Sequence, residues 1–395
     1  MPVNTNTRID DFFQAIPKVE LHCHLLGTVR EATFRDLARR GKAPLTDDEI
    51  TAFYTRGDKP VGVLRVLRAL DAWLLQTPDD LHRITYEYLQ DAANHNVRYA
   101  EFFWNPTGTV RESGMTYLAA QTAIGQAIRD AQRDCAVTGR LIPSIDREAS
   151  PEDALAMVQW MCDHRCDETI GLGIDYREVG RPPELFAPAY ALARAAGFKT
   201  TAHAGEFGCD WKNVQTAVDL LRVDRVDHGY TIIDAPEFAQ ACAERGMVFT
   251  VVPTNSYYLR TLAKDRWALD HPIRKMRELG LALHPNTDDP TLHHVTPTQA
   301  WAMMHLDFDF SITDLRDCML NGLAAAWIDE STRRQWQAEF TSEFDHQFAV
   351  AQIVAAPRRL GDDPPRATSL TFNPWEHFIW YDTGKPLLAL KITTT

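Results

Sequence analysis

Val19-Glu20-Leu21-His22-Cys23-His24-Leu25 places two histidines one residue apart in a run of apolar and β-branched side chains. Alternate residues of an extended strand point to the same side, so the His22 and His24 imidazoles face one point in space. Neutral imidazole is a common zinc ligand. The stretch therefore predicts a buried strand whose end presents two candidate metal ligands.

Seven further runs have the composition of strands, and helical patterns lie between them. Several are continuous apolar stretches that turn polar at their end, which is typical of parallel strands buried on both faces. This repeated strand–helix alternation predicts an α/β fold, the (β/α)8 TIM barrel. The expected strands cover residues 19–25, 98–104, 141–147, 171–177, 199–203, 225–228, 248–253 and 281–286.

The barrel is expected to be a single domain over residues 1–345. A largely helical insertion over about residues 30–90, after the first strand, is expected to cover the barrel mouth as a lid. Residues 346–395 are interpreted as a C-terminal extension that packs on the barrel or forms a subunit contact. Their pattern carries no recognisable chemistry.

Composition excludes several classes of protein. The 395 residues are 45% hydrophobic and 24% charged, as in an ordinary globular protein, and the net charge is −13. That charge repels phosphate backbones, so we expect no nucleic-acid partner. The N-terminus has no signal peptide pattern, and no apolar run is long enough to span a membrane. Seven irregularly spaced cysteines indicate free thiols, so we expect a cytoplasmic protein with no membrane partner.

Polar clusters follow the predicted strands at their C-terminal ends, where barrel enzymes place their active sites. The fifth strand leads into Thr201-Ala202-His203-Ala204-Gly205-Glu206, the sixth into Val226-Asp227-His228-Gly229 and the eighth into Asn286-Thr287-Asp288-Asp289-Pro290. Three histidines and one aspartate form a nitrogen and oxygen donor set suited to zinc, with a position left for water. These candidate ligands are His22, His24, His203 and Asp288.

Each cluster also has a purely structural interpretation. His203 and His228 can be buried histidines, Asp288-Asp289-Pro290 can be a turn with a helix cap, and Glu206 can be a solvated carboxylate. All of them would then have to end barrel strands by accident. Their joint position favours an active site.

The same motifs resemble the adenosine deaminase family of the amidohydrolase superfamily. The resemblance is carried by Pro17-Lys18-Val19-Glu20-Leu21-His22-Cys23-His24 and by the three clusters after the fifth, sixth and eighth strands. Residues 85–89, 98–101 and 271–274 are also similar to family motifs. The likeness runs from about Pro17 to Phe340 in the family's order.

The resemblance implies one Zn²⁺ per subunit, bound by the four candidate ligands. Glu206 resembles the family's proton shuttle, which protonates the purine ring nitrogen beside the attacked carbon. His228 resembles the residue that orients the attacking water. Asp289 resembles the carboxyl group that holds the imidazole-ring side of a purine, and His24 is also expected beside the substrate. The implied reaction is hydrolytic deamination with release of ammonia.

One departure from the family pattern concerns the sugar end of the substrate. Adenosine deaminases carry aspartate two residues after the histidine pair, members acting on the free base carry glutamate, and members with nucleotide-like substrates often carry asparagine. This chain has Leu26, which cannot accept a hydrogen bond. Leu26 therefore predicts a substrate that is apolar or alkylated at that end. The alternative is that Leu26 packs against the lid.

Two further departures follow the fourth and seventh strands. Glu178 lies where the family has a glycine whose amide contacts the purine, so Arg177 and Glu178 are expected either to pair with each other or to contact the substrate. Pro253-Thr254-Asn255-Ser256 transposes the last two residues of the family's usual Pro-Thr-Ser-Asn.

We expect a zinc-dependent deaminase of a 6-aminopurine nucleoside or a related aminopurine, such as adenosine or a 5′-modified, apolar analogue. The alternatives are hydrolysis of another C–N bond and a binding protein without turnover. The intact Glu206, His228 and Asp288 argue against a binding protein. The expected partner is a small molecule, and a homo-oligomer is an open alternative to a monomer.

Overall fold

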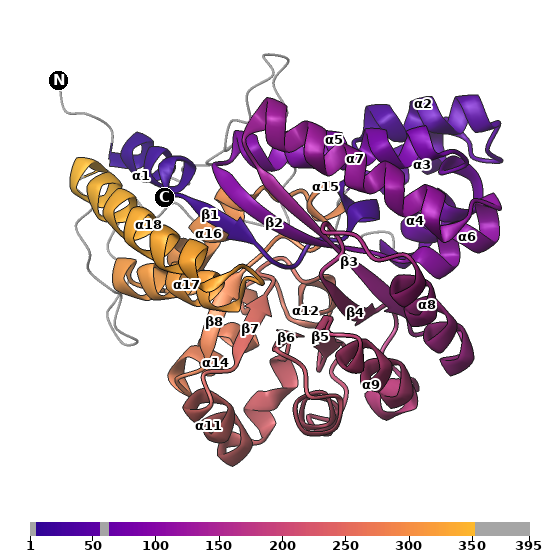
Figure 1. Ribbon diagram of the computed structural model, residues 1–395. Coiled ribbons are helices and arrows are strands. Elements are labelled where there is room, and N and C mark those ends of the chain that lie inside the picture. Colours follow the sequence, from indigo (N-terminus) through magenta and orange to yellow (C-terminus); the bar gives the residue numbers. More distant parts are fainter. Residues whose placement is uncertain (1–4, 56–62, 352–395) are drawn as a thin grey trace.

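Eight parallel strands form a ring in which each strand pairs with the next one along the chain (Figure 1). This computed structural model describes residues 5–55 and 63–351. The predicted (β/α)8 barrel is confirmed. The strands are β1 (Lys18–Glu20), β2 (Val97–Trp104), β3 (Thr138–Asp146), β4 (Gly171–Asp175), β5 (Lys199–Ala204), β6 (Arg225–His228), β7 (Val248–Val251) and β8 (Ala282–Pro285).

The strands are buried on both faces, which explains their continuous apolar composition. Every residue of β2 except Arg98 is buried, and β4, β6 and β7 are buried throughout. One face packs on the outer helices and the other fills the interior of the ring. The C-terminal ends of the strands all meet at one mouth of the barrel.

The first strand is shorter than predicted. β1 ends at Glu20, because Leu21 N donates to the side chain of Asn286, at 2.8 Å, and not to a carbonyl of a neighbouring strand. The chain then continues in an extended form. The strand predicted over residues 19–25 therefore exists, but it ends five residues earlier than predicted.

The ring closes beyond the ends of β8 and β1. Cys23 and Asp288 form a parallel bridge there. His24 N donates to Asp288 O at 2.8 Å, and Asp288 N donates to His22 O at 3.0 Å. These bonds place the histidine pair directly at the barrel mouth.

Helices cover the outside of the ring. α5 packs along α7 and against β2, α8 packs on α9, and α17 packs on β8. The helices of this layer are α5 (Pro78–Asn94), α7 (Tyr117–Cys135), α8 (Pro151–Asp163), α9 (Ala187–Ala195), α11 (Pro236–Glu244), α14 (Pro272–Glu278), α16 (Pro297–Leu306) and α17 (Ile312–Ala325).

Local sequence signals set several of these helix starts. Ser150 caps α8 by accepting from Asp153 N, while the Asp153 carboxylate accepts from Ser150 N, which is a capping box. Proline follows at the first helical position. The shorter elements are α6 (Pro106–Ser113), η3 (Pro183–Phe186), α10 (Lys212–Thr216), η4 (Ala217–Leu221), η5 (Tyr230–Asp234), α12 (Ser256–Thr261), α13 (Trp267–Asp270) and α15 (Pro290–His293).

The insertion after β1 is helical, as predicted, but only part of it lies over the barrel mouth. Its last helix, α5, belongs to the outer layer, because it packs along α7. The remaining elements are η1 (Leu25–Thr28), α2 (Glu31–Gly41), α3 (Asp47–Phe53), α4 (Val63–Ala69) and η2 (Leu70–Leu74). In Figure 1, α2, α3 and α4 gather on one side of the ring.

Arg68 fastens α4 to the barrel. Its Nη1 lies 2.6 Å from Asp146 Oδ2 at the end of β3, and its Nη2 donates to Glu148 Oε2 at 2.7 Å. The guanidinium also lies 4.0 Å from the centre of the Tyr176 ring, just after β4. One side chain of the insertion therefore contacts the ends of two neighbouring strands.

The C-terminal part of the described chain is a long helix, α18 (Glu330–Ala351), which packs against α1 (Thr5–Ala15) and α17. The predicted extension over residues 346–395 begins in this helix, and its residues 352–395 lie outside the described part of the chain. Among the described helices, none is both long and apolar enough to cross a bilayer.

A buried ion pair crosses the interior of the ring. The Arg225 guanidinium on β6 binds the Glu101 carboxylate on β2, and both side chains are fully buried. Glu101 Oε1 also accepts from Trp327 N at 2.6 Å, and Arg225 Nη2 donates to Leu21 O at 3.0 Å. The pair thus joins β2 and β6 with the segment just after β1 and the segment that follows α17.

We predict that Glu101→Ala strongly destabilises the fold. The substitution leaves the buried Arg225 charge without its carboxylate, which typically costs about 3–5 kcal/mol of the free energy of unfolding. Urea denaturation measures this loss. Glu112→Ala, which removes the exposed partner of Arg111, is the control and is expected to change little. Equal stability of the two variants would contradict the prediction.

Candidate active site

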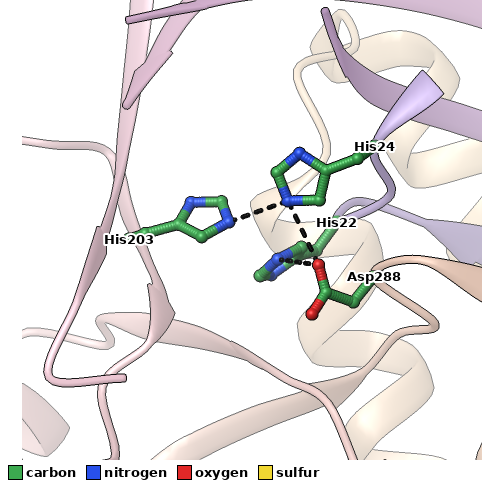
Figure 2. A group of neighbouring side chains, drawn as sticks. All are labelled: His22, His24, His203 and Asp288. Atoms are coloured by element: carbon green, nitrogen blue, oxygen red, sulfur yellow. Dashed lines mark hydrogen bonds and ion pairs between the residues drawn. The ribbon is translucent and has the colours of Figure 1, made fainter. Parts of the chain in front are cut away.

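The structure brings the four predicted metal ligands together at the barrel mouth. The three imidazoles and the carboxylate point towards one another (Figure 2), and the candidate ligand atoms all lie within 4.8 Å of each other. Each comes from the end of a strand or the segment just after it, which is why residues far apart in sequence meet. All four side chains are buried. They are His22, His24, His203 and Asp288.

The imidazole Nε2 atoms of this cluster lie close to one another and to one carboxylate oxygen. His24 Nε2 lies 3.1 Å from His203 Nε2 and 3.1 Å from Asp288 Oδ1. His22 Nε2 lies 3.5 Å from the same Asp288 oxygen, and it has no hydrogen-bond partner among the residues that the structure describes. Nitrogen and oxygen lone pairs therefore converge on one small volume.

The tautomers of the His22 and His203 rings follow from their contacts with Thr250 and Asp227, which lie on the side of the rings away from the cluster. Thr250 Oγ1 donates to Asp227 Oδ1 at 2.8 Å, so it accepts from His22 Nδ1 at 3.0 Å. His203 Nδ1 lies 3.3 Å from Asp227 Oδ2. Each ring thus carries its proton on Nδ1 and turns the lone pair of Nε2 to the centre of the cluster.

Asp175, the last residue of β4, does the same for the third ring. Its Oδ2 lies 3.3 Å from His24 Nδ1. Burial lowers the pKa of His24, but hydrogen bonds to Asp175 and Asp288 outweigh it and raise that pKa well above its ordinary value. His24 Nε2 therefore attracts a positive charge, either a proton or a metal ion. Burial, with the charge of His22, lowers the pKa of His203 to about 4 and keeps that ring neutral.

The donor set fits a divalent cation. Two imidazole lone pairs that face each other at 3.1 Å repel unless a cation or proton lies between them. Three nitrogens and one carboxylate oxygen are the ligands that zinc prefers, and carboxylates behind the histidines are the usual support. Burial raises the pKa of Asp288, but contacts with His22 and His24 hold it well below its usual range. Asp288 is thus ready to bind as an anion.

Unusual backbone conformations occur at the same strand ends. Asp288 and His228 have φ angles of 65° each, and Tyr176 has 63°, in the left-handed region that non-glycine residues seldom adopt. Such conformations persist where surrounding contacts hold them and are typical of functional sites. Here they turn side chains at the ends of β4, β6 and β8 out of strand alternation.

Glu206 and His228 form a second pair beside the cluster. His228 Nε2 lies 3.5 Å from Glu206 Oε2, and Asn255 Nδ2 donates to Glu206 Oε1 at 3.1 Å. Burial raises the pKa of Glu206 well above its ordinary value, and the charges of Asp288 and Glu178 add to the shift. Burial also holds the pKa of His228 well below its ordinary value, with His22 adding to it. The pair thus combines a carboxyl group that holds its proton with a neutral imidazole.

A cavity of about 360 Å³ opens onto these groups, which is large enough for a small ligand. One wall is apolar and comes from the insertion, with Val63, Leu64 and Leu67 of α4. The polar wall contains His24, Asp175, Arg177, His203, Glu206, Asp288 and Asp289. One helix of the insertion, α4, therefore contributes a wall of the cavity.

Asp289, which we expect to bind the substrate, is a buried residue of the cavity lining. It follows Asp288 directly. A Cβ atom at Gly27 would lie 1.9 Å from Asp289 Oδ1, so glycine is required at that position to make room for the carboxylate. The segment after the histidine pair and the end of β8 shape this side of the cavity together.

Arg177 and Glu178 differ in their exposure and in whether they line the cavity. Arg177 is exposed and lines the cavity, whereas Glu178 is buried and is not part of the lining. The Glu178 carboxylate accepts from Gly205 N at 2.9 Å and from Glu206 N at 3.0 Å. Its oxygens are therefore bound to the protein. The expectation that Glu178 contacts the substrate or pairs with Arg177 is not supported by this placement.

Leu26 is also placed away from the cavity lining. It lies in η1, is almost fully buried, and belongs to an element that contacts α4, α5 and α15. This placement favours the alternative that Leu26 packs against the lid.

Sequence reasoning missed the outer partners of the site. Asp175, Asp227, Thr250 and Asn255 lie at or just after the ends of β4, β6 and β7, the positions that identified the ligands. Asp227 even precedes His228 within a recognised motif. Asn255 belongs to the transposed Pro-Thr-Asn-Ser stretch, and its contact with Glu206 gives that departure a structural role.

Comparison with known proteins gives consistent results. Residues 17–342 match the family described as adenosine deaminase. An adenine deaminase of Rhodospirillum rubrum is 35% identical over 336 residues, covering 84% of this chain and 98% of the relative. Among solved structures, a zinc-bound amidohydrolase of Burkholderia ambifaria is 62% identical, with a TM-score of 0.87 over 89% of this chain and 96% of the other. An adenine deaminase structure from Arthrobacter aurescens is 26% identical, with a TM-score of 0.76 over 85% and 100% of the two chains.

We predict that Asp227→Asn weakens metal binding without removing a ligand. The amide can no longer take the proton of His203 Nδ1 as an anion does, and loss of such a partner typically lowers metal affinity about 10–100-fold. Competition with a chromophoric chelator measures the affinity. Asp219→Asn on the surface is the control. Wild-type affinity in Asp227→Asn would contradict the assigned tautomers.

Proposed function

We propose that this chain, which belongs to the adenosine deaminase family, is a zinc-dependent deaminase of a 6-aminopurine that carries an apolar substituent, as in a 5′-modified nucleoside. The coarser activity follows from the family and its relatives: the protein is an enzyme that hydrolyses the C–N bond of an aminopurine. The observation that carries the proposal is one cavity lined by three members of the buried cluster, His24, His203 and Asp288, together with Glu206 and Asp289.

We infer that the cluster binds one Zn²⁺ per subunit, through His22, His24, His203 and Asp288. The converging lone pairs and the carboxylates behind the rings support this assignment. A divalent cation in such a site lowers the pKa of a water molecule towards neutrality and so makes it a nucleophile. The other steps of the reaction depend on side chains of the chain itself.

Glu206 supplies the proton that activates the ring. Because burial raises its pKa, its carboxyl group is protonated at a pH where an exposed carboxyl is not, and it can donate to the ring nitrogen beside C6. The neutral His228 orients the attacking water. The water oxygen forms a bond to C6 and gives one proton to the Glu206 carboxylate, which passes it to the amino group. The bond from C6 to the amino nitrogen then breaks and ammonia leaves. The second water proton returns to Glu206 as C6 becomes a carbonyl, which restores the carboxyl group.

The remaining lining residues orient the substrate. Asp289, which is next to the ligand cluster, and His24, which belongs to it, both line the cavity and would face a bound purine. The α4 side chains Val63 and Leu64 give the other wall an apolar character, which suits an alkyl or similar substituent. Arg177 lines the same cavity, and in the described ranges no carboxylate pairs with it, so we expect it to contact a polar group of the substrate.

We predict that Glu206→Gln keeps the metal and loses most activity. Glutamine preserves the size of the side chain but cannot transfer a proton, and such a loss typically lowers kcat by about 10²–10⁴-fold. Metal analysis and an ammonia-release assay measure the two quantities. The exposed Glu237→Gln is the control. A kcat within a few fold of wild type would show that Glu206 is not the proton shuttle.

We predict the substrate preference from the apolar wall. A panel of adenine, adenosine, 5′-deoxyadenosine and 5′-alkylthio adenosines should give the highest kcat/KM for the 5′-apolar members. Leu64→Asp should reduce this preference, because a carboxylate replaces part of the apolar wall. Ammonia release from none of these compounds by the zinc-loaded enzyme would favour hydrolysis of a different C–N bond.

A further inference from the structure

We propose that Glu178 is a positioning residue that sets the location of Glu206 through the backbone of the loop that carries it. The inference rests on the proposed role of Glu206. It assigns a different task to a carboxylate that lies next to the cavity but is not part of its lining.

In the described part of the chain, the hydrogen bonds of the Glu178 side chain go to one loop and one short helix. Its Oε1 accepts from Gly205 N at 2.9 Å and from Asn213 Nδ2 of α10 at 2.8 Å. Its Oε2 accepts from Glu206 N at 3.0 Å. One carboxylate thus binds two consecutive peptide N–H groups, and hydrogen bonds to a charged acceptor are the stronger kind.

The loop needs this anchor because regular structure ends just before it. β5 ends at Ala204, and Glu206 lies outside any helix or strand. Gly205 turns the chain with a φ of 69°, and a Cβ atom there would lie 2.5 Å from Thr231 Oγ1. Packing therefore fixes one side of the turn, and the Glu178 carboxylate fixes the amide side.

The direction of Glu178 follows from the end of β4. Tyr176 adopts a φ of 63°, so the chain leaves strand alternation immediately after Asp175. Arg177 then points to the cavity, whereas the Glu178 carboxylate points to the loop that carries Gly205 and Glu206. Glu178 thus connects two strand ends of the site, the β4 end that supports His24 and the β5 end that carries Glu206.

Glu206 is therefore held at both ends. Asn255 binds its carboxyl group at Oε1, and Glu178 binds its peptide N–H. A proton donor must be fixed to within a fraction of an ångström to serve one ring nitrogen, since small displacements of a reacting group lower the rate strongly. Loss of the backbone anchor should reduce catalysis while the metal ligands remain in place.

The test is Glu178→Gln, which keeps the size of the side chain. Its amide oxygen can still accept, but its NH₂ group faces a peptide N–H, so at least one anchor bond is lost. We expect the bound metal to be unchanged, KM to change less than about threefold and kcat to fall about 10–100-fold. A folded, metal-loaded variant with kcat within about twofold of wild type would overturn the proposal.

Asp80→Asn is the matched control. Asp80 is a buried carboxylate that also accepts from two consecutive peptide N–H groups, Gln76 N at 3.1 Å and Thr77 N at 2.9 Å, but it caps α5 outside the cavity lining. This variant should lower the thermal midpoint of unfolding and leave kcat unchanged. A fall in kcat equal to that of Glu178→Gln would show that general destabilisation explains both, and would overturn the proposal.

A double variant separates this inference from the proposed function. If Glu178 acts through Glu206, adding Glu178→Gln to Glu206→Gln should lower kcat by less than about twofold further. An additional tenfold loss would overturn the positioning role. Near-normal activity of Glu206→Gln alone would instead reject the proposed role of Glu206, on which this inference rests.

Discussion

The bonds that close the ring between its last and first strands are the constraint on which the site depends. The bridge between Cys23 and Asp288 joins the segment after β1 to the segment after β8. The same backbone holds His22 and His24 on one side and the Asp288 carboxylate on the other. Closure of the barrel and assembly of three of the four ligands are therefore a single structural event. His203 is added by β5, across the ring.

A second requirement is that the Nε2 lone pairs of the three histidines point to the centre of the cluster. The residues that contact the Nδ1 atoms of the same rings meet this requirement. Asp175, Asp227 and Thr250 each take the proton side of an imidazole, so that the other nitrogen is directed to the centre. The strained backbone at Asp288 and His228 has a related function. It turns side chains towards the cavity that a regular strand would point elsewhere. Stability that a relaxed backbone would offer has been given up for the geometry of the site.

The fold and the meeting of the four candidate ligands could be predicted from sequence, because both follow from simple periodicities. Apolar runs separated by helical patterns identify the barrel, and the rule that strand ends share one mouth brings His203 and Asp288 together. Side-chain direction in irregular segments follows no such periodicity. Glu178 was expected at the substrate because it replaces a family glycine, but the left-handed Tyr176 turns it under the next loop. The outer partners were missed because their role depends on contacts between strands that do not adjoin in sequence.

The pairing of the chain's early and late segments has a consequence for biosynthesis. Leu21 N donates a hydrogen bond to Asn286 Oδ1, and the two residues are 265 positions apart in sequence. The chain between them must therefore fold into a closed loop before the four candidate ligands can come together. A ribosome-bound chain carries its first histidine pair long before the aspartate that completes the set is synthesised. The complete cluster therefore exists only in a chain that has been synthesised past β8. A shorter product has the three histidines without the Asp288 carboxylate.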